Sequence, residues 1–214
     1  MSYSCPLCSH GNCESYCEDG RRRYFQCLRC RLVFVSPLQR LSAIEEKAEY
    51  DLHENVTNDP NYRKFLSRLF DPLVLRLAPQ STGLDFGCGP GPALWSMFEE
   101  SGYAMKKYDV FYEKNSSVLL ESYDFITATE VIEHLFYPGQ VIERLWKQLS
   151  AGGILGLMTK LVLDKVAFSH WHYKNDQTHV CFFSRESFVW LAEHLDAHLD
   201  ILGSDVILLS KRLD

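Results

Sequence analysis

The spacing of apolar and polar positions changes repeatedly along residues 82–210. Short apolar runs typical of buried strands cover residues 82–86, 104–109, 123–128 and 154–159. Helical spacing, with apolar residues every three or four positions, covers residues 93–101, 139–149 and 184–195, the last with Ser184 as its N-cap. This alternation predicts a parallel α/β sheet. Two further apolar runs, at 199–202 and 206–210, predict a closing antiparallel hairpin.

A helical segment precedes this alternation. Residues 42–78 carry apolar side chains at helical spacing, namely Tyr62, Phe65, Leu66, Leu69 and Phe70. Pro60 lies near the start of the helix, and Asp71-Pro72 is expected to interrupt it before residues 73–78. Because the segment directly precedes the first predicted strand, we expect it to lie across the main domain as a linker or lid.

Cysteines concentrate at the N-terminus, where six of the eight fall within the first 30 residues. Two CxxC pairs with 18 residues between them comprise Cys5, Cys8, Cys27 and Cys30. This spacing is typical of a structural zinc site, and a disulfide framework is the rival interpretation. Cys13 and Cys17 are either alternative ligands, together with His10, or free thiols. We therefore predict a zinc ribbon over residues 1–40, a helical linker or lid over 41–80, and a main domain over 81–214.

The formal net charge of −6 is unevenly distributed. Residues 1–40 hold six arginines against three acids, and this local excess of +3 leaves −9 for the remainder. Arg21–Arg23 are therefore interpreted either as a solvated turn or as an RNA contact. No apolar run approaches the roughly 18–20 residues of a membrane span, and the N-terminus lacks an apolar signal stretch. These features predict a cytoplasmic protein without membrane contact, and they predict no particular oligomeric state.

The first predicted strand runs into a glycine-rich loop, which covers residues 85–91 with the sequence DFGCGPG and opens a predicted helix. Glycines allow a tight turn and a close approach of ligand to main chain. Pro90 and Pro92 remove amide donors that a pyrophosphate would need, which suits S-adenosylmethionine (SAM) better than a dinucleotide. Asp109 ends the next predicted strand, where a carboxylate can accept both hydroxyls of a ribose.

Four stretches in order, GLDFGCGPG, YDV, YDFITATEVIEHL and LSAGGILGLMT, resemble the class I SAM-dependent methyltransferase superfamily. The pairs CPLC and CLRC, with the later WHYKNDQTHVCFFS, further resemble a bacterial subgroup that carries a zinc ribbon before the methyltransferase domain. The resemblance implies a Rossmann-like, mostly parallel sheet and SAM as the methyl donor. It also implies a set of cofactor-binding residues: Asp85, Gly87, Gly89 and Gly91 for the methionine part, Asp109 for the ribose, and Thr129 with Glu130 beside the sulfonium.

The chain departs from the superfamily pattern after Asp109. Only 14 residues separate Asp109 from Asp124, whereas each parallel crossover needs about a dozen residues or more. One crossover fits and two do not, so the third strand of the usual order is expected to be missing or rudimentary. The acidic residue that commonly reads the adenine has no clear counterpart, and stacking on residues 110–112 is the alternative.

Several polar residues are candidates for catalysis. His179, in DQTH beyond the last parallel strand, is our first candidate for a general base, and His170 and His172 are its neighbours. Glu130, Glu133 and His134 are spaced so that one turn would present them on one side. This arrangement resembles some metal-dependent O-methyltransferases and predicts a second divalent metal, against a structural or cofactor-proximal role for the three residues.

Three functions are compatible with these features. The leading hypothesis is a SAM-dependent methyltransferase that acts on a small-molecule or biosynthetic acceptor, at oxygen, with His179 and His134 as catalytic residues. The first alternative is an RNA methyltransferase whose basic ribbon contacts RNA. The second is a non-catalytic SAM-binding or interaction module, which the short connection between Asp109 and Asp124 would explain.

Overall fold

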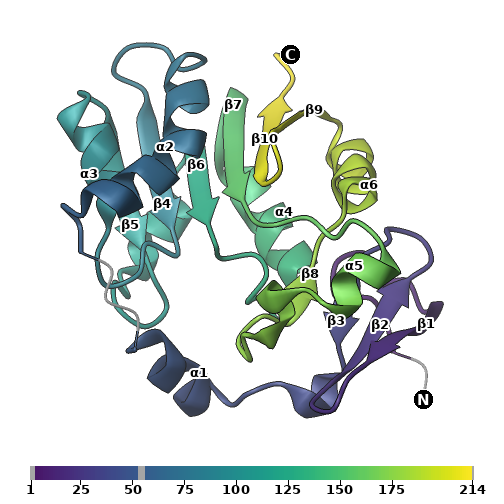
Figure 1. Cartoon of the computed structure of the whole chain (residues 1–214). Helices are drawn as coiled ribbons and strands as arrows, with labels where there is room; N and C mark the ends of the chain where they lie inside the picture. Colours follow the sequence, from purple (N-terminus) through teal and green to yellow (C-terminus); the bar gives the residue numbers. More distant parts are fainter. Residues whose placement is uncertain (1–2, 53–55, 214) are drawn as a thin grey trace.

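The computed structural model describes residues 3–52 and 56–213, and two sheets organise the described chain (Figure 1). The larger sheet has six strands in the order β5-β4-β6-β7-β10-β9. The smaller sheet has four strands in the order β1-β2-β3-β8.

The six-stranded sheet consists of β4 (Thr82–Phe86), β5 (Ala104–Tyr108), β6 (Tyr123–Thr129), β7 (Leu149–Met158), β9 (Ala197–Leu202) and β10 (Val206–Lys211). β4 pairs in parallel with β5 and β6, and β6 pairs in parallel with β7. β10 is antiparallel to both β7 and β9. The predicted mostly parallel α/β sheet with a closing antiparallel hairpin is therefore confirmed.

The third strand of the usual order is missing from the described chain, as predicted. The connection between β5 and β6 instead contains the 3-10 helix η2 (Ser116–Leu120), and β5 is the edge of the sheet. The Tyr123 hydroxyl donates to Val118 O at 2.7 Å, and the Gln148 side chain donates to Leu119 O. These bonds hold the shortened connection against the start of β6, so the sheet tolerates the loss of an edge strand.

Helices cover both faces of this sheet. They are α2 (Pro60–Val74), α3 (Ala93–Glu100), α4 (Pro138–Gln148) and α6 (Arg185–Leu195). Buried side chains of α2 and α3 cluster with Phe125 and Leu208, whereas those of α4 and α6 cluster with Ile126 and Leu209. Adjacent residues of one strand thus belong to opposite clusters, because successive side chains of a strand point to opposite faces.

The expected interruption at Asp71-Pro72 is wrong, since α2 continues through Pro72 to Val74. Proline in a helix removes one hydrogen bond and crowds the preceding turn. Pro72 has no N–H to donate to Arg68 O, so α2 loses one intrahelical bond there. Leu69 and Leu73, on either side of it, are fully buried, and their burial holds the last turn against the sheet.

The N-terminal segment forms the four-stranded sheet together with a strand from the C-terminal half. β1 (Cys13–Glu18), β2 (Arg23–Cys27) and β3 (Val33–Val35) are sequential antiparallel strands, and β8 (Cys181–Phe182) pairs with β3. Residues 32–35 are completely buried and share one apolar cluster with Phe168 and Phe182. The ribbon therefore has no separate core and packs as part of the main domain.

The linker contains α1 (Ala43–Tyr50), which lies apart from the sheets at the lower left of Figure 1. Ser42 and Glu45 form a capping box at its start. No residue of α1 is buried, but the Tyr50 ring contacts the rings of His134 and Phe111 at centroid distances of 5.3 and 5.7 Å. The predicted lid stays a prediction, and Tyr50 is the residue of α1 through which such a lid would contact the main domain.

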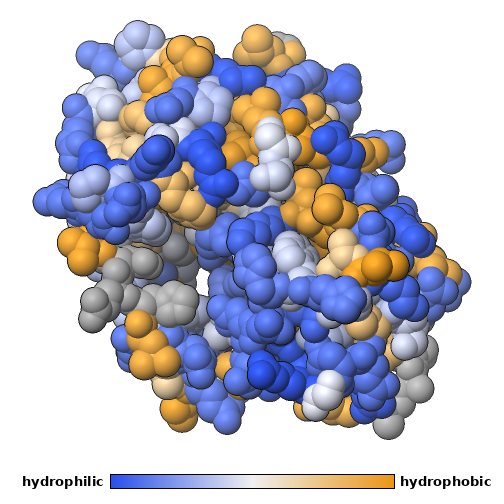
Figure 2. All heavy atoms as spheres, viewed as in Figure 1, coloured by the Kyte–Doolittle hydropathy of each residue, from blue (hydrophilic) through white to orange (hydrophobic). Residues whose placement is uncertain are grey.

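The carboxyl ends of β4, β6 and β7 point downward in Figure 1, toward α5 (Lys165–Ser169) and η3 (His172–Asn175). In Figure 2, hydrophilic residues gather over this lower central area, whereas apolar patches lie mainly over the sheet above. Within residues 3–52 and 56–213, no helix combines the length and apolarity needed to cross a bilayer.

Candidate functional site

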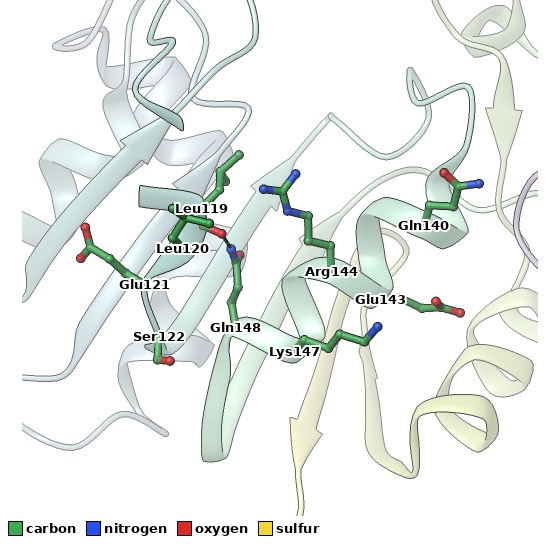
Figure 3. A pocket seen from close by; sticks show the side chains of 9 residues that line it. All are labelled: Leu119, Leu120, Glu121, Ser122, Gln140, Glu143, Arg144, Lys147 and Gln148. Carbon is green, nitrogen blue, oxygen red and sulfur yellow. Dashed lines mark hydrogen bonds between the residues drawn. The ribbon is translucent and has the colours of Figure 1, made fainter. Parts of the chain in front are cut away.

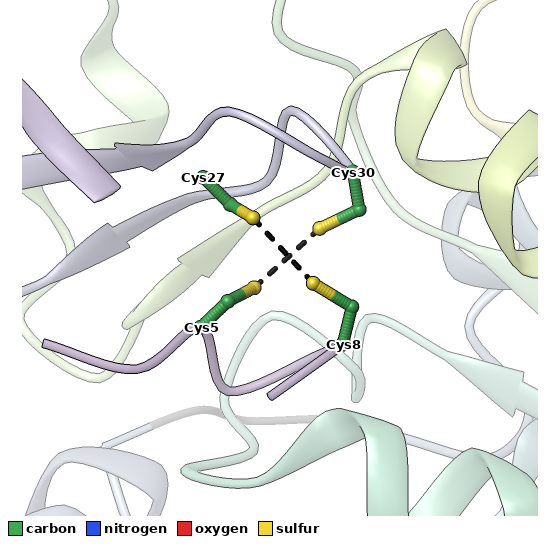
Figure 4. Close-up of side chains that lie close together, drawn as sticks. All are labelled: Cys5, Cys8, Cys27 and Cys30. Atoms are coloured by element: carbon green, nitrogen blue, oxygen red, sulfur yellow. Dashed lines mark hydrogen bonds between the residues drawn. The ribbon is translucent and has the colours of Figure 1, made fainter. Parts of the chain in front are cut away.

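The four cysteines of the two CxxC pairs converge on one point (Figure 4). Cys5 Sγ lies 3.4 Å from Cys30 Sγ, and Cys8 Sγ lies 3.5 Å from Cys27 Sγ. All four are free thiols, and their sulfur atoms lie within 4.8 Å of one another. This donor set suits a tetrahedral zinc ion and leaves no open coordination position for chemistry. Cys13 and Cys17, also free thiols, lie outside the set.

The glycine-rich loop after β4 has the backbone conformation that its glycines allow. Gly87 and Gly89 have φ values of +75° and +64°, which favour glycine. A Cβ on Gly87 would lie 2.5 Å from Val131 Cγ2, so the loop packs directly against the EVIEH segment. A Cβ on Gly89 would meet no atom of the described residues within 4 Å. The loop is thus packed on one side and open on the other, as a ligand-binding loop would be, and we refer to residues 85–91 as the cradle.

Asp85 lies beneath this loop, where it is 3% exposed. Its carboxylate accepts a hydrogen bond from Thr127 Oγ1 on β6 at 2.9 Å. Burial raises the pKa of Asp85 to about 6, and the Thr127 hydroxyl counteracts part of that effect. Asp85 is therefore an anionic group close to the loop at neutral pH and a neutral one in moderately acidic solution.

Asp109 follows β5 and faces the same loop. It accepts hydrogen bonds from the backbone amides of Gly89 at 3.0 Å, Phe111 at 2.7 Å and Tyr112 at 3.1 Å. A carboxylate has about four acceptor positions, so one remains for a ligand. The three amides fix the carboxylate beside the cradle, and the residues expected to stack on adenine follow it in the chain.

The EVIEH segment forms a tight turn at the carboxyl end of β6. Glu130 has a φ of +52°, an uncommon conformation for a non-glycine residue that often occurs at functional sites. Glu133 is completely buried. Ligand atoms of Glu133, His134 and His179 all lie within 4.8 Å of one another. The structure thus brings together both predicted catalytic histidines with the central acid of the predicted metal site.

Tyr173 joins the two glutamates of this turn. Its hydroxyl donates to Glu133 Oε1 and lies 3.2 Å from Glu130 Oε2. Glu130 Oε1 and Glu133 Oε2 are buried and have no hydrogen-bond partner within residues 3–52 and 56–213. Burial, joined for Glu133 by the negative charge of Glu130, raises the pKa of both carboxyl groups. The free carboxylate oxygen of Glu133, together with the imidazoles of His134 and His179, forms a donor set that a divalent cation would complete.

His179 is 6% exposed, and its ring is held by its own loop. The Nδ1 atom lies 2.7 Å from Tyr173 O. Since a carbonyl only accepts, Nδ1 carries the proton and Nε2 presents its lone pair. Nε2 lies 3.7 Å from Asp176 Oδ2, and burial lowers the pKa of His179. A neutral imidazole with a fixed tautomer is suited to act either as a base or as a metal ligand.

The other candidates lie apart from this group. His170 and His172 are exposed, and His172 Nε2 lies 3.3 Å from Lys160 Nζ. Thr129 is the last residue of β6 and directly precedes Glu130, the first residue of the EVIEH turn, which we call the acidic turn. Tyr173 lies in the stretch WHYKND, but its bonds to the two glutamates could not be predicted from the sequence because 43 and 40 positions separate it from Glu130 and Glu133.

The interpretation of Arg21–Arg23 as a solvated turn is wrong for the central residue. Arg21 and Arg23 are exposed, but Arg22 is 6% exposed. Its guanidinium is turned into the protein, where it donates to carbonyl oxygens of the loop that carries His179. Packing therefore removes Arg22 from the surface available to a nucleic acid.

A separate cavity of about 360 Å³ lies between η2 and α4 (Figure 3). Its lining includes Ser122, directly before β6, and Gln148, at the end of α4. It therefore lies at the amino end of β6, opposite the edge where the cradle and the acidic turn meet. Ligands of open α/β sheets bind at the carboxyl edge, so this cavity is not part of the candidate site.

Comparison with known proteins identifies the class to which this fold and cradle belong. Over residues 60–199, more than half of the chain, the sequence matches the family described as Methyltransferase domain. Comparison with curated proteins gave no match.

Three solved structures are similar to this chain, and the two with TM-scores of 0.50 or more show the likeness of the fold. Magnesium protoporphyrin IX methyltransferase from Synechocystis PCC 6803, with bound SAM, has a TM-score of 0.53 at 11% identity, and the alignment covers 79% of this chain and 91% of that one. The 1,6-didemethyltoxoflavin-N1-methyltransferase from Burkholderia thailandensis, with bound 1,6-didemethyltoxoflavin and S-adenosylhomocysteine, has a TM-score of 0.50 at 13% identity, covering 94% and 100%. An O-methyltransferase family protein from Burkholderia thailandensis has a TM-score of 0.49 at 10% identity over 72% of this chain, which spans 59% of that protein's length.

The six-stranded sheet and the cradle at its carboxyl edge define an α/β methyltransferase fold. The chain belongs to the methyltransferase family that its sequence matches, and it is a SAM-dependent methyltransferase.

Proposed function

We propose that this methyltransferase transfers the methyl group of SAM to an oxygen atom of a small-molecule acceptor. We further propose that Glu133, His134 and His179 hold a divalent cation beside the acceptor, and that the four N-terminal cysteines hold a structural zinc. The observation that supports the proposal most directly is the buried Oε2 atom of Glu133, which has no hydrogen-bond partner among the described residues and belongs to the same cluster as His134 and His179.

Burial disfavours the charged form of Glu130 and Glu133 and raises the pKa of both, and a bound cation would offset that cost. An ionised carboxylate is costly to bury without a partner, and Tyr173 supplies only one proton to the two glutamates. The imidazoles of His134 and His179 lie next to each other, with ring centroids 4.6 Å apart. Carboxylate oxygens suit Mg²⁺ and Mn²⁺, whereas imidazole nitrogens suit transition metals such as zinc and iron, so a mixed set of this kind can hold a divalent cation. A bound cation would polarise a hydroxyl of the acceptor and lower its pKa.

His179 contributes to chemistry through its Nε2 atom. The Nδ1 proton is engaged by Tyr173 O, so Nε2 can accept a proton from an acceptor hydroxyl or coordinate the cation. Methyl transfer is a direct displacement at the sulfonium carbon, in which the protein positions two reactants and removes a proton from one of them. The buried setting of His179 excludes water that would compete for its lone pair.

The cradle and its flanking acids support the SAM half of the proposal. Asp85 is a buried carboxylate at the end of β4, where the cradle begins, and would pair with the ammonium group of SAM, and Asp109 retains an acceptor position for a ribose hydroxyl. Thr129 ends β6, two residues after Thr127, which bonds to Asp85, and one residue before Glu130. The sulfonium would therefore lie at the end of β6, next to the acidic turn.

SAM affinity is expected to fall as the pH decreases through about 6. Burial raises the pKa of Asp85 to about 6, so the carboxylate that would pair with the ammonium group is ionised above that pH and neutral below it. Between about pH 7 and pH 5 the dissociation constant should rise roughly tenfold. Titration calorimetry at several pH values measures this, with Asp85→Asn as the control that should bind weakly and without pH dependence in this range. A constant affinity in the wild-type protein would contradict the assignment.

The proposed function is tested by measuring cation binding and product formation on zinc-loaded protein. Wild-type protein is expected to bind one Mn²⁺ per chain in addition to zinc, and Glu133→Gln should weaken that binding by roughly tenfold or more. Glu193→Gln, an exposed acid on α6, is the matched control and should bind Mn²⁺ as the wild type does. A panel of catechols, hydroxybenzoates and aromatic amines with labelled SAM should yield O-methylated products. Unchanged Mn²⁺ binding in Glu133→Gln, or products methylated only at nitrogen, would refute the proposal.

A further inference from the structure

Arg22 directly precedes β2, in the turn between β1 and β2 of the ribbon, yet its side chain contacts the loop that carries His179. Its Nη1 donates to Gln177 O at 3.2 Å and to His179 O at 2.9 Å. Its Nη2 donates to Asp176 O at 2.8 Å and to Lys174 O. All four terminal N–H groups of one guanidinium are thus used on four carbonyls of one short loop, a match to the fixed fork of donors that only arginine offers.

A buried ion pair provides a second link between the ribbon and this loop. Lys174 is 5% exposed, and its Nζ lies 2.5 Å from Asp19 Oδ2 in the turn between β1 and β2. The Asp19 carboxylate also accepts from the backbone amide of Arg22 at 2.9 Å and from the Tyr24 hydroxyl at 3.1 Å. The turn that presents Arg22 is therefore itself tied to the loop that Arg22 holds.

Strand pairing fixes the other end of the loop. Val35 N donates to Val180 O at 2.9 Å, and β3 pairs with β8 directly afterwards. The amides of Val180 and Cys181 both donate to Glu133 O at 2.9 Å. His179 thus lies between the residues bound by Arg22 and the strand pair β3–β8. The two residues that follow His179, Val180 and Cys181, also bond to the backbone of Glu133, a proposed metal ligand.

The ribbon also contacts the segment that follows the acidic turn. Gly139 N donates to Pro6 O, in the first cysteine pair, at 3.3 Å. A Cβ on Gly139 would lie 2.1 Å from Leu7 O, so only glycine permits this approach. Arg40 Nη1 donates to Phe136 O at 3.2 Å. Both loops that supply the cluster of Glu133, His134 and His179 are therefore held by the N-terminal ribbon.

We propose that the ribbon positions the two loops of the active site, and that Arg22 is the positioning residue that holds His179 in place. This inference rests on the proposed function of the cluster formed by Glu133, His134 and His179. Arg22 does not touch that cluster's side-chain atoms but binds the backbone oxygen of His179, from which the ring projects. Without the guanidinium, four carbonyls of a largely buried loop would lose their donors, and the loop would relax away from the geometry that two ligands require.

If Arg22 positions the loop, its replacement should alter hydrogen exchange in that loop alone, whereas a general loss of stability would alter exchange throughout the protein. In Arg22→Ala, hydrogen exchange of peptides covering residues 172–181 is expected to rise by roughly tenfold or more, while peptides covering the cradle at 85–91 exchange as in the wild type. Affinity for Mn²⁺ should fall by roughly 10–100-fold. SAM affinity should stay within about twofold, because the cradle is held by other elements. Zinc content should stay at one per chain.

Two further variants complete the test. Arg22→Lys keeps the charge but cannot reach four carbonyls at once, so its exchange and Mn²⁺ affinity should lie between those of the wild type and Arg22→Ala; it also carries the comparison if Arg22→Ala does not fold. Arg21→Ala, at an exposed neighbour, should behave as the wild type. Exchange that rises equally throughout Arg22→Lys, or unchanged exchange over 172–181 in both Arg22 variants, would overturn the proposal. If the wild type binds no Mn²⁺, the proposed metal site fails, and the exchange measurements still decide the role of Arg22.

Discussion

Replacement of one cysteine of the proposed zinc site, as in Cys27→Ser, is expected to destabilise the whole protein rather than the N-terminal segment alone. Binding of zinc to such sites contributes on the order of 10 kcal/mol to folding, which is comparable to the total stability of a typical domain. The ribbon shares its apolar cluster with Phe168 and Phe182, and β3 pairs with β8. Loss of the ribbon would therefore expose part of the core of the main domain and remove one side of the β8 pairing.

Thermal unfolding together with a zinc count measures this effect. A loss of about 5 kcal/mol would lower the melting temperature by roughly 10–20 °C in a chain of this size. Cys17→Ser is the matched control, since Cys17 is a free thiol of the same sheet that lies outside the four-sulfur cluster. This control should retain one zinc per chain and the wild-type melting temperature. A Cys27→Ser protein with full zinc content and unchanged unfolding would contradict the four-cysteine site.

The elements that the sequence predicted correctly are those set by local patterns. Alternating strands and helices, the glycine-rich loop and the closing hairpin all depend on residues close together in the chain. The missing third strand followed from a simple limit on length between Asp109 and Asp124. The continuation of α2 through Pro72 was not predictable in this way, because the burial of Leu69 and Leu73 outweighs a local helix-breaking preference.

The features that could not be predicted depend on contacts between distant residues. β8 has two residues, Cys181 and Phe182, too few to show a strand period. The partners of Arg22 are backbone carbonyls more than 150 positions away, and a carbonyl acceptor leaves no mark on the sequence because every residue has one. The sequence favoured His179 over His170 and His172 as the candidate base, but it did not show that His179 lies beside His134. The pairing of β3 with β8 and the bonds of Arg22 to the loop place His179, rather than His170 or His172, beside His134.

Replacement of His179 by alanine is expected to reduce the turnover number strongly while leaving SAM affinity nearly unchanged. Removal of a general base or of a ligand that polarises the acceptor lowers rates by roughly 10²–10⁴-fold. His179 contacts Tyr173 and His134, whereas the cradle is formed by β4, β5 and their loops. SAM binding should therefore change by no more than about twofold.

His172→Ala is the matched control, because His172 is an exposed histidine of the same loop beside Lys160. Its turnover should stay within about twofold of the wild type, as for most surface substitutions. Rates are measured with the oxygen acceptor that gives product in the panel of catechols and hydroxybenzoates. Absorption of Co²⁺ added to zinc-loaded protein reports on the proposed second site independently of turnover. Weakened Co²⁺ binding in His179→Ala would assign the residue as a ligand, and retained binding with slow turnover would assign it as the base. Turnover equal to that of His172→Ala would contradict both roles, because a buried imidazole with a fixed tautomer would then contribute nothing to methyl transfer.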